Sequence, residues 1–184
     1  MRKLILFILP VLLLTGCFHV PDNLSSSATI EVKEMDFTTL EQSTGSYTEA
    51  APQLFLVQSQ VQLDQLWDMY VSGNILNPSP APQIDFNGNF ILAAFAGQKS
   101  TGGYSFEITG INTNDAQSGT SDVAVYATLQ SPAPGTTVTQ ALTSPFHVVQ
   151  VKRQAGFQFE DVYMILTDEQ SKSTQIVSVN QTEL

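Results

Sequence analysis

The chain has few of the residues that build thiolate or imidazole sites. Its 184 residues include one cysteine, Cys17, and two histidines, His19 and His147. This count excludes a disulfide within the chain and a multi-histidine metal site, since structural zinc sites use four cysteine or histidine ligands. No acidic loop has the alternating spacing of a calcium-binding loop. We therefore expect no bound metal and no cofactor.

Basic residues are also scarce. Seven Lys and Arg stand against seventeen Asp and Glu, for a formal net charge of −10 at pH 7. Arg2 and Lys3 are two of the seven, so the rest of the chain is more acidic still. Nucleic-acid binding needs a basic surface that contacts phosphates, and the adjacent pair Lys152 and Arg153 does not make one. We expect no nucleic-acid partner and no contact between the folded part and anionic lipid headgroups.

The common catalytic motifs are missing too. The sequence has no Gly-x-Ser-x-Gly, no phosphate-binding loop and no His-Glu-x-x-His, and its one cysteine lies near the N-terminus. His147 has no carboxylate or nucleophile beside it, so a half-exposed strand residue is the better expectation than a general base. We therefore predict that the protein is not an enzyme.

The N-terminus contains a lipobox-like stretch, Leu-Thr-Gly-Cys at residues 14–17. Two basic residues precede an apolar run at 4–14, as in a secretory signal, and this run is shorter than the roughly 20 residues that span a bilayer. Similarity to bacterial lipoprotein signals implies cleavage before Cys17, diacylglyceryl and fatty-acyl modification of that residue, and membrane attachment. An ordinary signal peptide with an incidental cysteine is the alternative.

The sequence is predicted to consist of three parts. Residues 1–17 are the predicted signal peptide, and the polar segment 18–28 is a predicted flexible tether. Residues 29–184 are long enough for one domain with a sizeable core. Phe18, rather than aspartate, follows Cys17, which by similarity to Gram-negative sorting rules permits export to the outer membrane. We expect a lipoprotein of the cell envelope, in the outer membrane or, in a Gram-positive cell, on the outer face of the one membrane.

Hydrophobic periodicity predicts one helix. Its apolar positions follow the spacing i, i+3, i+4 and i+7 of a single helical face: Leu63, Leu66, Trp67 and Tyr70. Ser59 is the expected N-cap, and Gly73-Asn74 is the expected end. Because Trp67 belongs to the apolar face, we expect it in the core.

Short apolar or alternating segments predict about eight strands. Their ranges are 29–37, 54–57, 90–96, 104–109, 123–129, 146–151, 162–166 and 175–179. Segment 90–96 is apolar throughout, which is typical of a strand buried on both faces. The polar segment 38–52 is expected to form a loop or an irregular hairpin arm. The fold class is therefore mainly β or α+β, a single antiparallel sandwich or open barrel with one amphipathic helix.

Three turn-rich segments could present a contact surface. Gly102 and Gly103 permit a tight reversal between two strands, Pro134-Gly135 is typical of a type II turn, and Pro145 stands at the head of a strand. An ordinary structural role is the alternative for each. The candidate partner-binding residues are Lys99, Ser100, Thr101, Gly102, Gly103, Tyr104, Pro134, Gly135, Pro145, Phe146 and His147.

The order of these signals resembles the PrcB family. Leu66, Trp67 and Tyr70 end the helix, Lys-Ser-Thr-Gly-Gly-Tyr follows at 99–104, and Pro-Phe-His-Val-Val follows at 145–149. The similarity covers roughly residues 54–153. It implies a protein-binding accessory or stabilising subunit of an envelope or surface protease, with no catalytic residues.

Two other functions remain open. Bacterial chagasin-like inhibitors of cysteine proteases use a Thr-Thr-Gly-Tyr/Phe loop and an Arg-Pro-Trp/Phe loop, which Thr101 to Tyr104 and Pro145-Phe146 resemble. Ser144 stands where that family has arginine. An envelope lipoprotein with a structural or small-ligand role is the third possibility.

Overall fold

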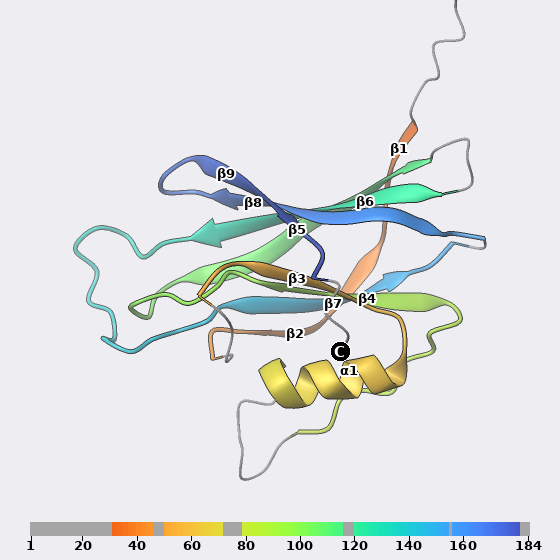
Figure 1. The fold of residues 1–184 in the computed structure, drawn as a ribbon. Helices are drawn as coiled ribbons and strands as arrows, with labels where there is room; N and C mark the ends of the chain where they lie inside the picture. The colour runs from red at the N-terminus through yellow and green to blue at the C-terminus, as the bar shows by residue number, and fades with distance from the viewer. Residues whose placement is uncertain (1–30, 46–49, 72–78, 116–119, 155, 181–184) are drawn as a thin grey trace, which may run out of the picture.

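Nine strands and a short helical segment make up the part of the chain that the computed structural model describes (Figure 1). That part comprises residues 31–45, 50–71, 79–115, 120–154 and 156–180. The predicted signal peptide with Cys17, the tether at 18–28 and the helix end at Gly73-Asn74 lie outside it, and they remain predictions.

The strands form two stacked sheets. The five-stranded sheet has the order β1 (Glu31–Glu34), β5 (Ser105–Asp115), β6 (Ser121–Gln130), β8 (Phe159–Asp168) and β9 (Ser173–Ser178). The four-stranded sheet has the order β2 (Phe37–Ser43), β7 (Phe146–Lys152), β4 (Asn89–Phe95) and β3 (Gln53–Val57). The predicted β-sandwich is therefore confirmed, and the sheets do not close into a barrel.

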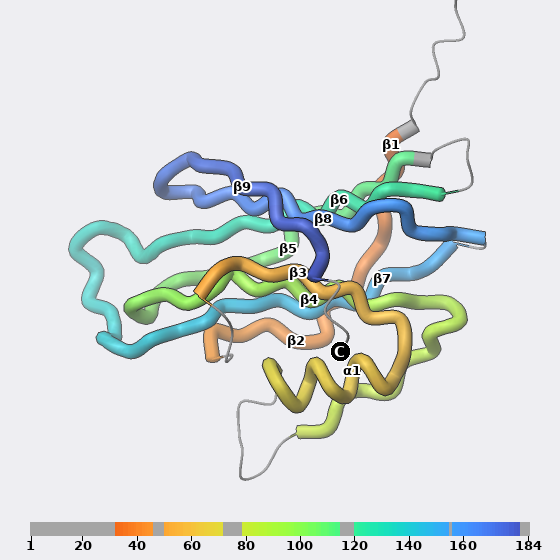
Figure 2. Tube along the Cα trace, viewed as in Figure 1, coloured from red at the N-terminus to blue at the C-terminus, as the bar shows by residue number. Residues whose placement is uncertain are grey.

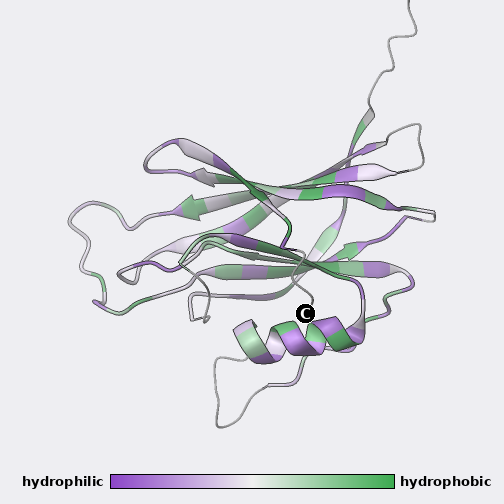
Figure 3. Ribbon diagram, viewed as in Figure 1, coloured by the Kyte–Doolittle hydropathy of each residue, from purple (hydrophilic) through white to green (hydrophobic). Residues whose placement is uncertain are grey.

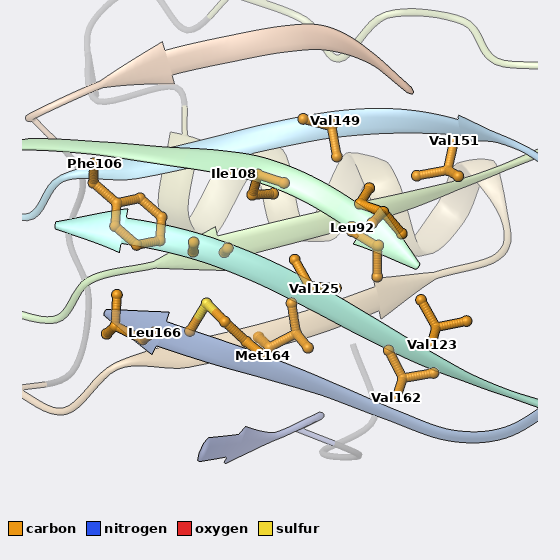
Figure 4. Close-up of a cluster of buried hydrophobic side chains, with 14 of the residues drawn as sticks. Leu92, Phe106, Ile108, Val123, Val125, Val149, Val151, Val162, Met164 and Leu166 are labelled. Atoms are coloured by element: carbon orange, nitrogen blue, oxygen red, sulfur yellow. The ribbon is translucent and has the colours of Figure 1, made fainter. Parts of the chain in front are cut away.

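The main core lies between the sheets. Inward side chains such as Leu92, Phe106 and Val125 are at most 2% exposed and meet in the space between the two layers (Figure 4). Hydrophobic and hydrophilic residues alternate along much of the strands (Figure 3), because successive side chains of a strand point to opposite faces. Strand β4 departs from this pattern, since residues 90–95 are all fully buried, as its continuous apolar run predicts.

A helical segment covers the outer face of the four-stranded sheet and explains the burial of β4 on both sides. Helix α1 (Gln60–Leu66) continues as the π-helical turn η1 (Trp67–Val71). The Ser59 Oγ accepts a hydrogen bond from the Gln62 N–H (3.3 Å), which confirms the predicted N-cap. Trp67 is buried against the sheet, as predicted, and forms a second apolar cluster with strand residues.

The predicted strand at 29–37, and the predicted loop or irregular hairpin arm at 38–52, are wrong in detail. Strand β1 ends at Glu34, Met35 enters the core, and the chain then crosses to the other sheet, where β2 begins at Phe37. The backbone of Met35 still donates to the Ile111 carbonyl (2.8 Å). Strand β2 was not predicted because it is an edge strand with mostly polar residues, which lack the alternation of a half-buried strand.

One strand pair is parallel, β6 with β8, whereas every other pair of described strands is antiparallel. The reason is that β7, which lies between them in sequence, belongs to the other sheet. The chain crosses the sandwich twice and returns in its original direction. The sequence pattern predicts an antiparallel fold, because strands that follow one another in sequence commonly pair that way. It therefore does not predict the parallel pair of β6 and β8.

No helix in the described part of the chain is long and apolar enough to cross a membrane.

Candidate functional site

Two loops far apart in sequence are joined at one end of the sandwich (Figure 2). The Lys99 N–H donates to the Thr143 carbonyl (2.7 Å), and the Thr143 N–H donates back to the Lys99 carbonyl (3.0 Å). The Gly102 N–H donates to the Thr139 carbonyl (2.9 Å), and the Thr143 hydroxyl donates to the Thr101 carbonyl (2.8 Å). We call the surface formed by residues 97–104 and 131–144 the loop end.

The base of the loop end is attached to the sheets by further backbone bonds. The Ala96 N–H donates to the Pro145 carbonyl (2.9 Å), and the Ser144 N–H donates to the Thr44 carbonyl (2.9 Å). The first bond continues the antiparallel pairing of β4 with β7, and the second accompanies an isolated parallel bridge between Gly45 and Ser144. The ends of the two loops nearest β4 and β7 are therefore attached to the four-stranded sheet.

The glycine pair is needed where the two loops touch. A Cβ on Gly102 would lie 2.3 Å from the Thr139 Oγ1, so a side chain there would push the loops apart. Gly103 has φ +84°, and a Cβ on it would lie 2.9 Å from the Val138 Cγ1. The pair thus allows close approach of residues 138 and 139, and Gly103 supplies a left-handed backbone that other residues rarely adopt.

The tip of the second loop is the predicted type II turn. The Thr136 N–H donates to the Ala133 carbonyl (3.0 Å), and Gly135 has φ +83°. Pro134 and Gly135 therefore occupy the central positions of the turn, as their residue types require. Both are exposed. Beside the turn lies an open hollow of about 270 Å³, lined by residues 130–134, 169 and 170.

A third segment, the turn between β8 and β9, borders the loop end. The Glu169 N–H donates to the Leu129 carbonyl (3.0 Å), which ties this turn to the end of β6. The Asp168 carboxylate accepts hydrogen bonds from the Ser171 and Gln170 N–H groups (3.1 and 2.9 Å). The Ser171 bond is the main cause that lowers the pKa of Asp168. Burial lowers the pKa of Lys99, and the Asp168 carboxylate partly offsets this effect.

Comparison with known proteins matches one segment of the chain. Residues 90–152 match the family model described as PrcB C-terminal. This segment, which we call the PrcB segment, is similar to the C-terminal domain of PrcB proteins. No curated protein and no solved structure matched the chain.

The PrcB segment runs from β4 to β7 and includes strands of both sheets. Both loops of the loop end lie within it. Strands β1 to β3, the helical segment and strands β8 and β9 lie outside it. The turn at 168–172, which borders the loop end, is thus a contribution from outside the PrcB segment.

The predicted site residues of the PrcB segment fall into two groups. Most belong to the surface of the loop end, where Ser100, Gly103, Pro134 and Gly135 are exposed and Lys99 and Thr101 are half-buried. Gly102 is buried between the loops. Tyr104 is partly buried and packs against the main core, so it faces inward as the first residue before β5.

Pro145, Phe146 and His147 are buried and support the loop end from inside. Phe146 stacks on Phe95 (ring centroids 5.6 Å apart) under the helical segment. His147 is 2% exposed, so the prediction of a half-exposed strand residue is wrong. Its strand lies between two others in the sheet, and its side chain points into the sandwich, which its position in the sequence does not reveal.

Both ring nitrogens of His147 are occupied. The Nδ1 atom accepts a hydrogen bond from the Ile108 N–H (2.9 Å), so the proton of the neutral ring is on Nε2, which donates to the Thr39 Oγ1 (2.8 Å). Burial lowers the pKa of His147, and Glu107 opposes this shift only in part. The imidazole therefore connects β7 to β5 of the other sheet and to β2.

The sequence prediction missed Leu142. This side chain is 67% exposed and lies next to Thr143, whose backbone pairs with Lys99. Among the described residues of the loop end, Leu142 is the large hydrophobic residue with an exposed side chain. No periodicity identifies it, because it lies in an irregular segment between strands.

Within the described residues, no group of three or more His, Cys, Asp or Glu side chains is placed to hold a metal ion.

The buried imidazole predicts a pH-dependent stability. The pKa of His147 is lower in the folded chain than its usual value of about 6.5, so the unfolded chain binds the proton first as the pH falls. The stabilisation by neutral His147 is complete above pH 6.5 and is lost as the pH falls from there toward the lowered pKa. We expect the free energy of unfolding to fall more steeply between pH 7.5 and 5.5 in the wild type than in His147→Gln, measured by urea denaturation.

Glutamine can keep both hydrogen bonds but cannot take up the proton. The wild type and His147→Gln contain the same carboxylates and the same His19. The difference between their slopes of unfolding free energy against pH therefore reports on His147. Equal slopes would contradict the neutral, buried state of the imidazole.

Proposed function

We propose that this protein is a lipid-anchored, non-enzymatic lipoprotein of the cell envelope whose loop end binds a protein partner. By its PrcB segment, the partner is an envelope or surface protease, for which the chain is an accessory or stabilising subunit. The observation that carries the proposal is the pairing of the two loops of that segment into one ordered surface with Leu142 exposed on it.

An ordered surface favours binding because little conformational entropy remains to be lost. The backbone bonds of Lys99, Gly102 and Thr143 already fix the relative position of the two loops. A partner then meets exposed backbone and small side chains around one apolar residue, Leu142. Protein interfaces commonly combine an apolar centre with a polar rim, and rigid loops retain more of the contact energy.

The position of the N-terminal strand is compatible with an anchor. Glu31, the first described residue, pairs with Asp115 at the far end of β5, whereas Ser105 at the other end of β5 follows the loop end. Eleven residues of strand separate the two ends, or roughly 35 Å at the usual rise. The chain that leads from Cys17 would thus join the described part at the end opposite to the loop end.

The state of His147 also supports a non-enzymatic role. Its Nδ1 lone pair is engaged by the Ile108 N–H, and the ring is shielded from solvent. A general base must reach a substrate proton with a free lone pair. His147 does not offer one.

The inhibitor hypothesis is less well supported. It requires two loops that enter a protease cleft, and Pro145-Phe146 is the second of them. The Phe146 side chain is 1% exposed and packs under the helical segment. It would have to leave the core in order to fill a cleft, at a cost of about 2 kcal/mol or more for exposing a phenylalanine.

Substitution of Leu142 tests the partner surface. We expect Leu142→Asp to weaken capture of the partner about tenfold or more, because it places a charge at the apolar centre of the contact. The measurement is affinity capture from detergent-solubilised envelopes, quantified by mass spectrometry. Since the wild-type side chain is exposed, the fold should be unaffected.

The matched control is Met69→Asp. Met69 is also exposed, at 50%, but it lies on the helical segment outside the PrcB segment. Capture that is unchanged by Leu142→Asp, or equally reduced by Met69→Asp, would reject the loop end as the binding surface. Inhibition of papain-type proteases by the added protein would instead favour the inhibitor hypothesis.

The anchor has a separate test. We expect the mature N-terminus to be a diacylglyceryl-modified Cys17 carrying an amide-linked acyl chain, seen by mass spectrometry of the N-terminal peptide. Cys17→Ser should remove the acyl mass and prevent signal-peptide cleavage at this position. An unmodified cysteine at the N-terminus, or cleavage at another residue, would support an ordinary signal peptide.

A further inference from the structure

The edge strand β9 differs from the other edges of the two sheets. In the described part of the chain the edges are β1 and β9 of one sheet and β2 and β3 of the other. Edge strands are usually protected against pairing with other chains by charges, proline, bulges or a covering segment. Strand β9, with the sequence Ser-Thr-Gln-Ile-Val-Ser, has no charge, no proline and no register shift.

The other three edges each have such protection. Strand β1 carries Lys33 and Glu34, and β2 carries Glu41 beside a register shift. Strand β3 is covered at one point, where the Asn180 N–H donates to the Leu54 carbonyl (2.7 Å). The lack of protection on β9 therefore suggests that this edge has a partner.

The backbone of β9 has a row of groups directed outward. The Val179 N–H donates to the Val162 carbonyl (3.0 Å), and the register continues this antiparallel pairing along β8. Since bonded and non-bonded positions alternate, the N–H and C=O groups of Thr174, Ile176 and Ser178 point away from β8. No described residue forms a backbone bond with them.

An apolar row of side chains leads to the same edge. Tyr126 is paired with Ile165, and Ile165 is paired with Ile176, across three neighbouring strands. Ile176 is 69% exposed and Tyr126 is 39% exposed, because the outer face of this sheet has no helix over it in the described chain. The row stops at β9, where a further strand would continue it.

We propose that β9 pairs antiparallel with β9 of a second copy of this chain, about a two-fold axis at Ile176. This register places Ile176 opposite Ile176 of the second copy, and it pairs Thr174 with Ser178 in both directions. The apolar row then runs uninterrupted from Tyr126 of one copy to Tyr126 of the other. The two five-stranded sheets become one continuous ten-stranded sheet.

Symmetry favours a second copy as the occupant, and the lack of charge on β9 permits the contact. The chain has a net charge of −10, so two copies repel over most of their surface, but β9 has no ionisable side chain. A two-fold axis needs a self-complementary surface, and Ile176 at the centre with uncharged hydroxyl residues on both sides provides one. The contact is limited to one six-residue strand from each copy, so we expect a weak dimer that depends on concentration.

The antiparallel arrangement leaves both loop ends free. Strand β9 starts at the turn that borders the loop end, so the two-fold axis puts the two loop ends at opposite ends of the joined sheet. Pairing and partner binding therefore use different surfaces.

Cysteine cross-linking in the full-length chain tests the register. In the proposed dimer, the two Ile176 Cα atoms lie about 5.5 Å apart, within the range for a disulfide. We expect Ile176→Cys to form a covalent dimer under mild oxidation. Thr174→Cys alone should form about tenfold less, since its copies lie about 13 Å apart along the strands, but it should cross-link to Ser178→Cys when the two variants are mixed.

Two controls make the result decisive. The unsubstituted chain reports any cross-linking through Cys17, and Val32→Cys reports random collision at an exposed position on the β1 edge. In analytical ultracentrifugation, Ile176→Lys should abolish the concentration-dependent dimer of the wild type. The proposal is overturned if Ile176→Cys cross-links no more than Val32→Cys, or if wild type and Ile176→Lys sediment alike as monomers. If β9 instead pairs with a strand of another protein, Ile176→Cys should cross-link no more than Val32→Cys.

Discussion

A buried imidazole connects the two sheets behind the loop end, beside the apolar core that packs between them. His147 lies at the start of β7, accepts from the Ile108 N–H near the start of β5, and donates to Thr39 on β2. Of the three strands that it joins, β5 and β7 each follow one of the two loops of the loop end. The imidazole therefore fixes β7 relative to β5 close to the point where both loops end.

The Pro-Phe-His motif and the glycine-rich motif thus have complementary roles. The glycines bring the two loops into contact at the surface, where a partner could reach them. Phe146 and His147 fix the strand beneath, one against the helical layer and the other against the opposite sheet. A family segment that contains both motifs, residues 90–152, therefore contains the surface and much of its support.

The elements predicted well from the sequence are those in which burial follows a simple pattern. Strand β4 is apolar at every position because it is covered on both faces, and α1 has one apolar face because it packs on a single sheet. Strand β2 was missed because an edge strand needs little apolar surface. The parallel pairing of β6 and β8 depends on which sheet β7 joins, and local pattern carries no information on that.

The candidate site shows the same division. The turn at Pro134-Gly135 was predictable because its residue types require particular backbone angles. The burial of His147 was not, since it depends on a bond to Ile108, which is 39 residues away in sequence. Leu142 also gave no signal, because the exposure of a residue in an irregular segment is decided by what packs around it.

The central claim is that the two loops form one ordered surface before any partner binds. Amide hydrogen exchange of the full-length protein, read residue by residue, tests it most directly. The account predicts that the amides of Lys99, Gly102 and Thr143 exchange as slowly as those of edge strands, because each donates to the opposite loop. Exchange of all three as fast as the exposed turn at Gly135 would contradict it.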